Sequence, residues 1–314
     1  WENIKKIKGI IQQELTYGKS LIIVVSAFSG ITDRLNELGV LASNRENHYK
    51  TLLEDIITRH EKTIEKLFPK PIEWKKEFHQ LIIELKEIIS GIYLLKEMSN
   101  RSSDLLLSFG ERFSALIISK YLQGEKIPSR YIDARDLIIT NSDHGKALVD
   151  KRETDKKIRT YFKNMEEVAI VTGFIASNET GVTTTLGRGG SDYTAAIIGS
   201  ALECEEIIIW TDVDGFMTAD PKKVPEAFTI SNLSYEEAME LSHWGAKVLH
   251  PPTIQPALVK KIPIKIKNTM NPENEGTFIQ ETAVENDFLI KGISSINEIS
   301  LIRVQGSGMI GVSG

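Results

Sequence analysis

The chain contains little cysteine, few aromatic residues and no long apolar run. Of its 314 residues only Cys204 is a cysteine, which excludes an internal disulfide and a cysteine-rich zinc site and fits a reducing compartment. No apolar run is long enough for a membrane span. The formal net charge of −5 gives no basic surface of the kind that binds nucleic acid. We therefore expect a cytoplasmic globular protein without nucleic-acid or membrane partners.

Short β-branched runs alternate with amphipathic helical patterns along most of the chain. Residues 20–27 and 205–211 are typical of strands buried on both faces of a parallel sheet. Residues 32–123 have a helical pattern, and 173–186 reads as a hairpin beside the sheet. Further strands are predicted at 129–132, 137–140, 167–172 and 263–268, and helices at 2–16, 153–163, 192–203, 234–243 and 252–260. This order predicts an α/β fold, in which helices cover both faces of a mostly parallel sheet.

A second unit is predicted at the end of the chain. The segment 271–276 (NPENEG) is polar and turn-forming, which is typical of a boundary. Beyond it, 288–295 and 298–305 read as two strands. The segment 306–311 (GSGMIG) has the spacing of dinucleotide-binding glycines, but a lone match without the following helix and acidic residue is a weak signal.

The segment 183–196 (TTTLGRGGSDYTAA) has the composition of a ligand-binding loop. A glycine-rich turn that opens into a helix brings backbone N–H groups and the positive helix end to one place, which suits an anion. Arg188 adds a planar donor fork for a carboxylate or phosphate. Asp192 would repel a phosphate unless it orients cations or receives an ammonium group, so the pair indicates an α-amino acid. The simpler alternative is that Ser191 or Asp192 only caps the helix.

Polar residues also follow other predicted strands, where ligands bind in parallel sheets. Ser26 follows the run at 20–27, and the run at 205–211 ends in Thr211 and Asp212. The acidic and basic turn that comes next can contact a nucleotide and its metal. The alternative is a surface turn rich in aspartate and glycine.

Six motifs, in order, carry a resemblance to a known family. They are VVSAFSGITD (24–33), GERFSA (110–115), VTGFIASN (171–178), TTTLGRGGSDYTA (183–195), WTDVDGFMTADP (210–221) and GAKVLHP (245–251). The chain resembles aspartokinases, of the amino-acid-kinase fold, and most closely the kinase portion of bifunctional aspartokinase–homoserine dehydrogenases.

The resemblance implies a three-layer α/β/α sandwich followed by a regulatory region. Residues 1–282 would be the catalytic domain, and 283–314 the start of an ACT-like α+β regulatory domain. The family's opening Lys-Phe-Gly-Gly-Thr-Ser strand is not found in this sequence. The sequence starts at Trp1 with a helical pattern and no methionine, so we expect it to be a fragment or a sequence read from coordinates, and the strand to be missing either from the protein or from this sequence alone.

The implied reaction transfers the γ-phosphate of ATP, bound with Mg²⁺, to the side-chain carboxylate of L-aspartate. It opens the biosynthesis of lysine, threonine and methionine. The resemblance also implies a homo-oligomer, either a dimer or a tetramer, and an end-product amino acid as effector of the ACT-like region. Two alternatives stay open: a kinase of the same fold for glutamate or acetylglutamate, and a non-catalytic module that senses amino acids.

The resemblance also assigns the site residues. We expect aspartate at Thr32, Glu111, Arg188, Gly189, Ser191 and Asp192. We expect ATP at Ser26, Gly190, Thr211, Asp212, Asp220, Lys222 and Lys247. Lys247 and Asp192 would be catalytic, the lysine stabilising charge on the transferred phosphoryl group and the aspartate orienting the lysines. No residue is assigned as a dedicated metal ligand.

Overall fold

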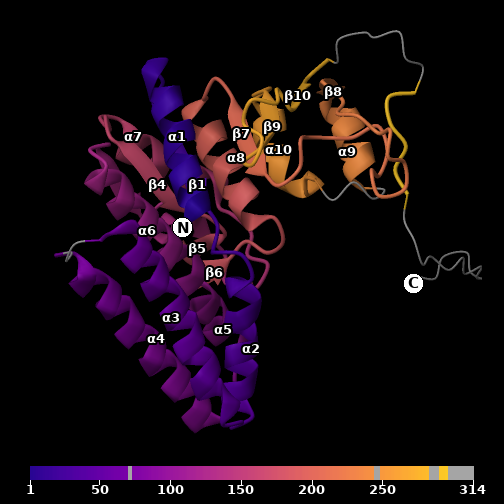
Figure 1. Ribbon diagram of the computed structural model, residues 1–314. Helices are drawn as coiled ribbons and strands as arrows, with labels where there is room; N and C mark the ends of the chain where they lie inside the picture. Colours follow the sequence, from indigo (N-terminus) through magenta and orange to yellow (C-terminus); the bar gives the residue numbers. More distant parts are fainter. Residues whose placement is uncertain (70–72, 244–247, 283–289, 296–314) are drawn as a thin grey trace, which may run out of the picture.

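The computed structural model describes residues 1–69, 73–243, 248–282 and 290–295 (Figure 1). Its helices are α1 (Glu2–Thr16), α2 (Ile31–Ser43), α3 (His48–Leu67), α4 (Lys75–Leu95), α5 (Asn100–Leu107), α6 (Phe109–Gly124), α7 (Lys151–Phe162), α8 (Gly190–Leu202), α9 (Tyr235–His243) and α10 (Gln255–Val259). Its strands are β1 (Ile22–Val25), β2 (Ser129–Ile132), β3 (Ile139–Thr140), β4 (Val168–Thr172), β5 (Ile175–Asn178), β6 (Thr183–Thr185), β7 (Ile207–Thr211), β8 (Asn232–Ser234), β9 (Ile264–Asn268) and β10 (Thr277–Gln280).

Strand β4 is the centre of a parallel sheet with the order β1-β4-β2. Its side chains alternate between two hydrophobic cores. Val168 and Ile170 belong to the core that includes α1, α3 and α6 residues, whereas Ala169 and Val171 belong to the core with α7 and α8 residues. Helices therefore cover both faces of this sheet, which confirms the predicted α/β/α layering.

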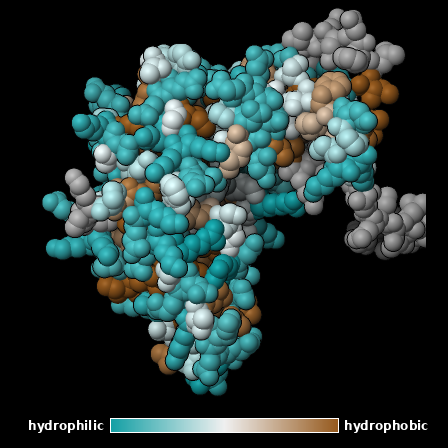
Figure 2. Space-filling model, viewed as in Figure 1, coloured by the Kyte–Doolittle hydropathy of each residue, from teal (hydrophilic) through white to brown (hydrophobic). Residues whose placement is uncertain are grey.

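Helices α2 to α5 extend away from the sheet as an elongated bundle (Figure 1). Their buried residues, among them Leu35, Ile56 and Leu85, recur at helical spacing and join the α6 side of the first core. No helix in the described part of the chain has the length and apolar character needed to cross a membrane. Hydrophilic side chains cover most of the face seen in Figure 2.

A second group of strands lies on the other side of α8, in the order β7-β9-β10-β8 (Figure 1). Its core is built on β7, β9, α9 and α10 and includes Ala196 of α8. The next two residues of α8, Ile197 and Ile198, pack into the core beneath β4. Helix α8 thus contributes to the cores of both halves.

The strands are mostly parallel, as predicted, but in the described residues they form three sheets where the sequence pattern suggested one. The pairs β1–β4, β2–β4, β3–β5, β7–β9 and β8–β10 are parallel, and β5–β6 and β9–β10 are antiparallel. The antiparallel pair β5–β6 is the hairpin predicted at 173–186.

Two predictions near the end of the chain were wrong. The segment 271–276 is a turn within one sheet, because β10 follows it and pairs with both β9 and β8. The described part of the strand predicted at 288–295, residues 290–295, has no strand structure. The strand predicted at 298–305, the GSGMIG segment and most of the expected ACT-like region lie outside the described residues.

Gly276 makes the turn before β10 possible. Its φ is +76°, and a Cβ there would clash with the carbonyl oxygen of Ile266 on β9. Gly181, in the β5–β6 turn, has a similar φ of +78° but no atom within 4 Å of a built Cβ. Alanine at either position has the cost of a positive φ, but only at Gly276 does its Cβ also clash with the backbone. Gly276→Ala should therefore lower the free energy of unfolding by about 1–3 kcal/mol more than Gly181→Ala does. Urea denaturation of both variants measures the difference, and equal losses would mean that the turn does not constrain the sheet.

Candidate active site

The glycine loop reverses the chain between β6 and α8. Gly187 and Gly189 have φ angles of +76° and +71°, in the left-handed region that favours glycine. Gly189 is the N-cap of α8, and no side chain donates or accepts a capping bond there. Ser191 and Asp192 lie in the first turn of the helix, so the alternative that one of them caps α8 is wrong.

The start of α8 lies directly against the ends of β1 and β4. A Cβ on Gly173, the residue after β4, would lie 2.6 Å from Cβ and 2.9 Å from Cα of Ser191. A Cβ on Gly190 would lie 2.7 Å from the ring of Phe174. The amide of Gly173 in turn donates to the carbonyl of Val25 at 2.9 Å. The glycine loop is therefore fixed at the carboxyl ends of the parallel strands, where ligands bind in such sheets.

Glu111 lies in the first turn of α6, on the same side of the sheet ends, and is only 3% exposed. Its Oε1 accepts a hydrogen bond from the amide of Ala27 at 3.1 Å, and its buried Oε2 has no hydrogen-bond partner among the described residues. The neighbouring Gly110 permits this approach, since a Cβ there would lie 2.7 Å from Cβ of Ala27. The same Cβ would lie 3.6 Å from Cγ2 of Ile31, which brings Thr32, in the first turn of α2, to this edge.

Burial shifts two predicted substrate carboxyls toward the neutral form. It raises the pKa of Glu111 to about 7, against two weaker effects of backbone hydrogen bonds. Burial also raises the pKa of Asp192 to about 6. Both groups would gain strongly from a cationic partner, because an adjacent positive charge offsets the cost of burying a carboxylate.

Arg188, in the glycine loop, has a guanidinium group that can bind a ligand. It is exposed and forms no ion pair with any described residue, and its charge helps to lower the pKa of His250, after the larger effect of burial. Other arginines near the strand ends are already paired. Arg112 forms a bidentate pair with Glu84 at 3.0 and 2.6 Å, and Arg135 a bidentate pair with Asp133. The charges of Arg112 and Arg135 are therefore neutralised by carboxylates of the protein, whereas that of Arg188 is not neutralised by any described residue.

Three predicted nucleotide residues lie at the ends of the strands on either side of α8. Ser26 is exposed after β1, and its carbonyl accepts a hydrogen bond from the hydroxyl of Ser114 at 2.6 Å. Thr211 ends β7 and donates to Oδ1 of the exposed Asp212 at 3.2 Å. Because α8 packs against both β1 and β7, these residues flank the glycine loop.

Asp220 and Lys222 are exposed in a turn of the arm that follows β7. Oδ1 of Asp220 accepts the amide of Lys222 at 3.0 Å, so the aspartate shapes the turn that carries the lysine. The structure shows no contact that joins this turn to the glycine loop within the described residues. Lys247 lies outside the described residues.

The sequence analysis missed a buried carboxylate, that of Asp104 on α5, which is 1% exposed. It lies 2.7 Å from Nδ1 of His144 and accepts bonds from the amide of Gly145 at 3.1 Å and from the hydroxyl of Thr185 at 2.6 Å. The turn that it holds supports the glycine loop, since a Cβ on Gly187 would lie 3.3 Å from the carbonyl oxygen of Gly145. Asp104 and its partner Thr185 are 81 positions apart in the sequence, so no local sequence pattern predicts this network.

In the described part of the chain no group of three or more His, Cys, Asp or Glu side chains could hold a metal by itself. Mg²⁺ in phosphotransferases is typically held by one or two carboxylates together with substrate phosphates and water. Asp192 and Asp212 fit that role, since each lies at a strand or helix end with its carboxylate in no ion pair to another described residue.

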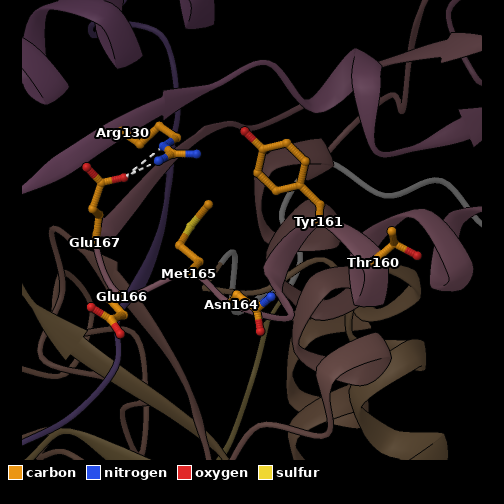
Figure 3. A pocket seen from close by; sticks show the side chains of 7 residues that line it. All are labelled: Arg130, Thr160, Tyr161, Asn164, Met165, Glu166 and Glu167. Carbon is orange, nitrogen blue, oxygen red and sulfur yellow. Dashed lines mark hydrogen bonds and ion pairs between the residues drawn. The ribbon is translucent and has the colours of Figure 1, made fainter.

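A surface hollow of about 430 Å³ lies at the opposite edge of the sheet (Figure 3). It is lined in part by Arg130 at the start of β2, Glu167 just before β4, and Tyr161 of α7. Arg130 and Glu167 lie side by side at its rim and form an ion pair at 2.6 Å (Figure 3). This hollow is at the amino ends of the strands, so it is separate from the candidate site.

Comparison with known proteins shows the family to which the chain belongs. A family model described as the amino acid kinase family matches residues 2–268. The chain belongs to the amino acid kinase family. The bifunctional aspartokinase/homoserine dehydrogenase 1 of Zea mays aligns with the whole chain at 37% identity, and the alignment covers 35% of that protein. Aspartokinase 1 of Arabidopsis thaliana aligns with the whole chain at 33% identity, and the alignment covers 55% of that protein. The chain thus spans about a third of the length of such bifunctional relatives.

Solved aspartokinase structures have the same fold. The structure of E. coli aspartokinase III in complex with aspartate and ADP superposes with a TM-score of 0.82 and 31% identity, covering 92% of this chain and 63% of that one. That of Clostridium acetobutylicum aspartate kinase has a TM-score of 0.77 and 30% identity, covering 92% and 63%. The similarity to aspartokinases therefore holds for sequence and for fold.

Glu111 should make the stability of the protein depend on pH. The folded state keeps this carboxyl protonated up to about pH 7, whereas in the unfolded state it ionises near pH 4.5. Because the folded state binds more protons between these values, its stability falls as pH rises through that window. Relative to wild type, Glu111→Gln should therefore gain about 3 kcal/mol of unfolding free energy between pH 4.5 and 7.5.

The measurement is urea denaturation of the protein without ligand across this pH range. Glu87→Gln, at an exposed position of α4, is the control for loss of one carboxylate. A difference between Glu111→Gln and wild type that does not change with pH would contradict the shifted pKa.

Loss of the Asp104 carboxylate should destabilise the turn beneath the glycine loop. Asp104→Ala leaves three buried or half-buried donors without their acceptor, and we expect it to cost about 3–5 kcal/mol of unfolding free energy. Asp143→Ala, in the same turn but exposed, should cost no more than about 0.5 kcal/mol. Equal and small losses in thermal or urea denaturation would show that the network carries no stability.

Proposed function

We propose that the protein is an aspartate kinase, which transfers the γ-phosphate of ATP to the side-chain carboxylate of L-aspartate. The observation that carries the proposal is the buried Oε2 of Glu111, which has no hydrogen-bond partner among the described residues and lies at the same sheet edge as an uncommitted arginine. An α-amino acid supplies one cation and one anion to such a pair. The relatives named above are aspartokinases, and one of them was solved with aspartate and ADP.

In this proposal, the α-ammonium group and the α-carboxylate of aspartate each bind a protein side chain of opposite charge. The α-ammonium group would donate to Glu111 and draw its carboxyl into the ionised form, because a bound cation lowers the pKa that burial has raised. The guanidinium of Arg188 would fork the α-carboxylate. Thr32, Gly189, Ser191 and Asp192 would complete the substrate side, with the side-chain carboxylate directed toward the nucleotide.

The chemistry asks little of the protein beyond position and charge. An aspartate side chain is already ionised at neutral pH, so the nucleophile needs no general base. The chain must hold it in line with the γ-phosphate and exclude water. Lys247 would neutralise charge that develops on the transferred group, and Asp192 would orient the cations around it.

The nucleotide would bind along the ends of β1 and β7. Ser26, Gly190, Thr211 and Asp212 would face its phosphates, and Asp220 and Lys222 would approach from the arm after β7. Bound Mg²⁺ would supply additional positive charge at the phosphates, held by Asp192 or Asp212. The positive end of α8 supports an anion at this position.

The larger setting of the enzyme is part of the proposal. We place it in the cytoplasm, as a dimer or tetramer, with an end-product amino acid as effector of the region from 283 onward. E. coli aspartokinase III has been solved with lysine and aspartate, which supports an effector of this class. A glutamate or acetylglutamate kinase and a non-catalytic amino-acid sensor are the alternatives, and the assay below separates all three.

Aspartate-dependent release of ADP by the full-length protein tests the function, with glutamate and acetylglutamate as competing acceptors. Arg188→Lys should raise KM for aspartate roughly 10-fold or more while changing KM for ATP less than about twofold, because lysine cannot reproduce the paired donors. Arg152→Lys, at an exposed position of α7, is the control. Preference for another acceptor would identify the other kinase, and amino-acid binding without ADP release would identify a sensor.

A further inference from the structure

Residues 290–295 lie against the arm that follows β7, beside α9 (Figure 1, yellow). We call this segment the strap, and residues 216–230 the nucleotide arm. The arm closes on itself, because the amide of Thr218 donates to the carbonyl of Phe228 at 2.9 Å and the amide of Phe228 to the hydroxyl of Thr218 at 3.2 Å. Its turn carries Asp220 and Lys222, to which the proposed function assigns contacts with the nucleotide.

The strap adds backbone and side-chain bonds to this arm. The amide of Ile293 donates to the carbonyl of Thr218 at 2.8 Å. The ammonium group of Lys223 donates to the hydroxyl of Ser295 at 2.8 Å. The strap thus contacts the arm on both sides of the turn that carries Lys222: at Thr218 before it and at Lys223 immediately after it.

The strap is itself held to the body of the protein. Nζ of Lys291 lies 2.8 Å from Oε1 of Glu237, in the first turn of α9. Oε2 of Glu237 accepts the amide of Ser234, and the amide of Glu237 donates to the hydroxyl of Ser234, so the strap is joined to a capping box. Burial would raise the pKa of Glu237, but Lys291 and the Ser234 amide outweigh it and hold that pKa below its ordinary value.

The packing between these points is close. A Cβ on Gly292 would lie 3.2 Å from a methyl group of Leu241 on α9 and 3.3 Å from one of Ile230 at the end of the arm. The strap therefore lies against α9 and the arm at once. With Lys291 fixed to α9, the bonds at Thr218 and Lys223 restrain the arm relative to the helix.

From these contacts we infer that the strap is a positioning element for nucleotide binding: it holds the arm so that Asp220 and Lys222 meet ATP. The inference rests on the proposed function, because that function assigns the arm to the nucleotide. None of the strap residues touches the substrate side of the site, where Glu111 and the glycine loop lie at the ends of β1 and β4. The strap should therefore affect ATP and leave aspartate unaffected.

Two substitutions at one position isolate the backbone bond. Ile293→Pro removes the amide that donates to Thr218, whereas Ile293→Ala keeps it and removes only a side chain that is 66% exposed. In the full-length protein, Ile293→Pro should raise KM for ATP about fivefold, the effect of one hydrogen bond, with KM for aspartate within about twofold of wild type. Ile293→Ala should leave both values within about twofold.

A second matched pair tests the side-chain bond. Ser295→Ala removes the acceptor of Lys223, and Ser294→Ala alters the neighbouring serine, which forms no such bond with any residue that the structure describes. Only Ser295→Ala should raise KM for ATP. If the alanine controls raise KM for ATP as much as the test variants do, or if aspartate and ATP are affected alike, the positioning role is wrong.

Hydrogen exchange and nucleotide binding separate this inference from the proposed function. Ile293→Pro, unlike Ile293→Ala, should speed exchange of the Thr218 and Phe228 amides and weaken ATP binding measured by calorimetry. Unchanged exchange would overturn the docking of the strap, and faster exchange with unchanged ATP affinity would overturn its positioning role. Absence of aspartate-dependent ADP release in wild type would overturn the proposed function, while exchange and ATP affinity would still decide on the strap.

Discussion

Strand β4 has no solvent-facing side: all five of its residues are buried between β1, β2 and the helices above and below. Because its pairing with both neighbours is parallel, the chain leaves the three strands at the same edge, after Val25, Ile132 and Thr172. The glycine loop can join this edge only through the close approach of Gly173 and Ser191. A slip of one residue in either pair would exchange the two cores and separate these ends.

The site costs stability because it buries the carboxyl group of Glu111. Glu111 is buried where its charge is disfavoured, and its second oxygen lacks a hydrogen bond from any described residue. A structural carboxylate would instead resemble Asp104, which receives bonds from three residues at both oxygens, or Asp133, which faces Arg135. The contrast distinguishes a carboxylate kept for a ligand from those that hold the fold.

Local patterns predicted much of this molecule. Isoleucines at helical spacing identified α1 between Glu2 and Thr16, and the short β-branched runs identified β1, β4 and β7. Strands β8 and β10 were missed, since three or four residues carry too little periodicity and their pairing depends on distant segments. The same limit applies to the site: the motifs indicated Glu111 and Arg188, whereas the bonds of Asp104 and of the strap join residues that are 40 to 81 positions apart.

Helix α8 gives the two halves a common axis. Ala196 belongs to the core under β7 and β9, and the adjoining Ile197 and Ile198 belong to the core under β4. Because α8 is packed into both cores, one half can rotate relative to the other only if its core shifts against this helix. The glycine loop at its first residue therefore stays near the pivot of any such rotation, where displacement is least. Phe216 and Ile230, at the two ends of the nucleotide arm, belong to the core under β7 and β9, so the arm would move with that half relative to the core under β4.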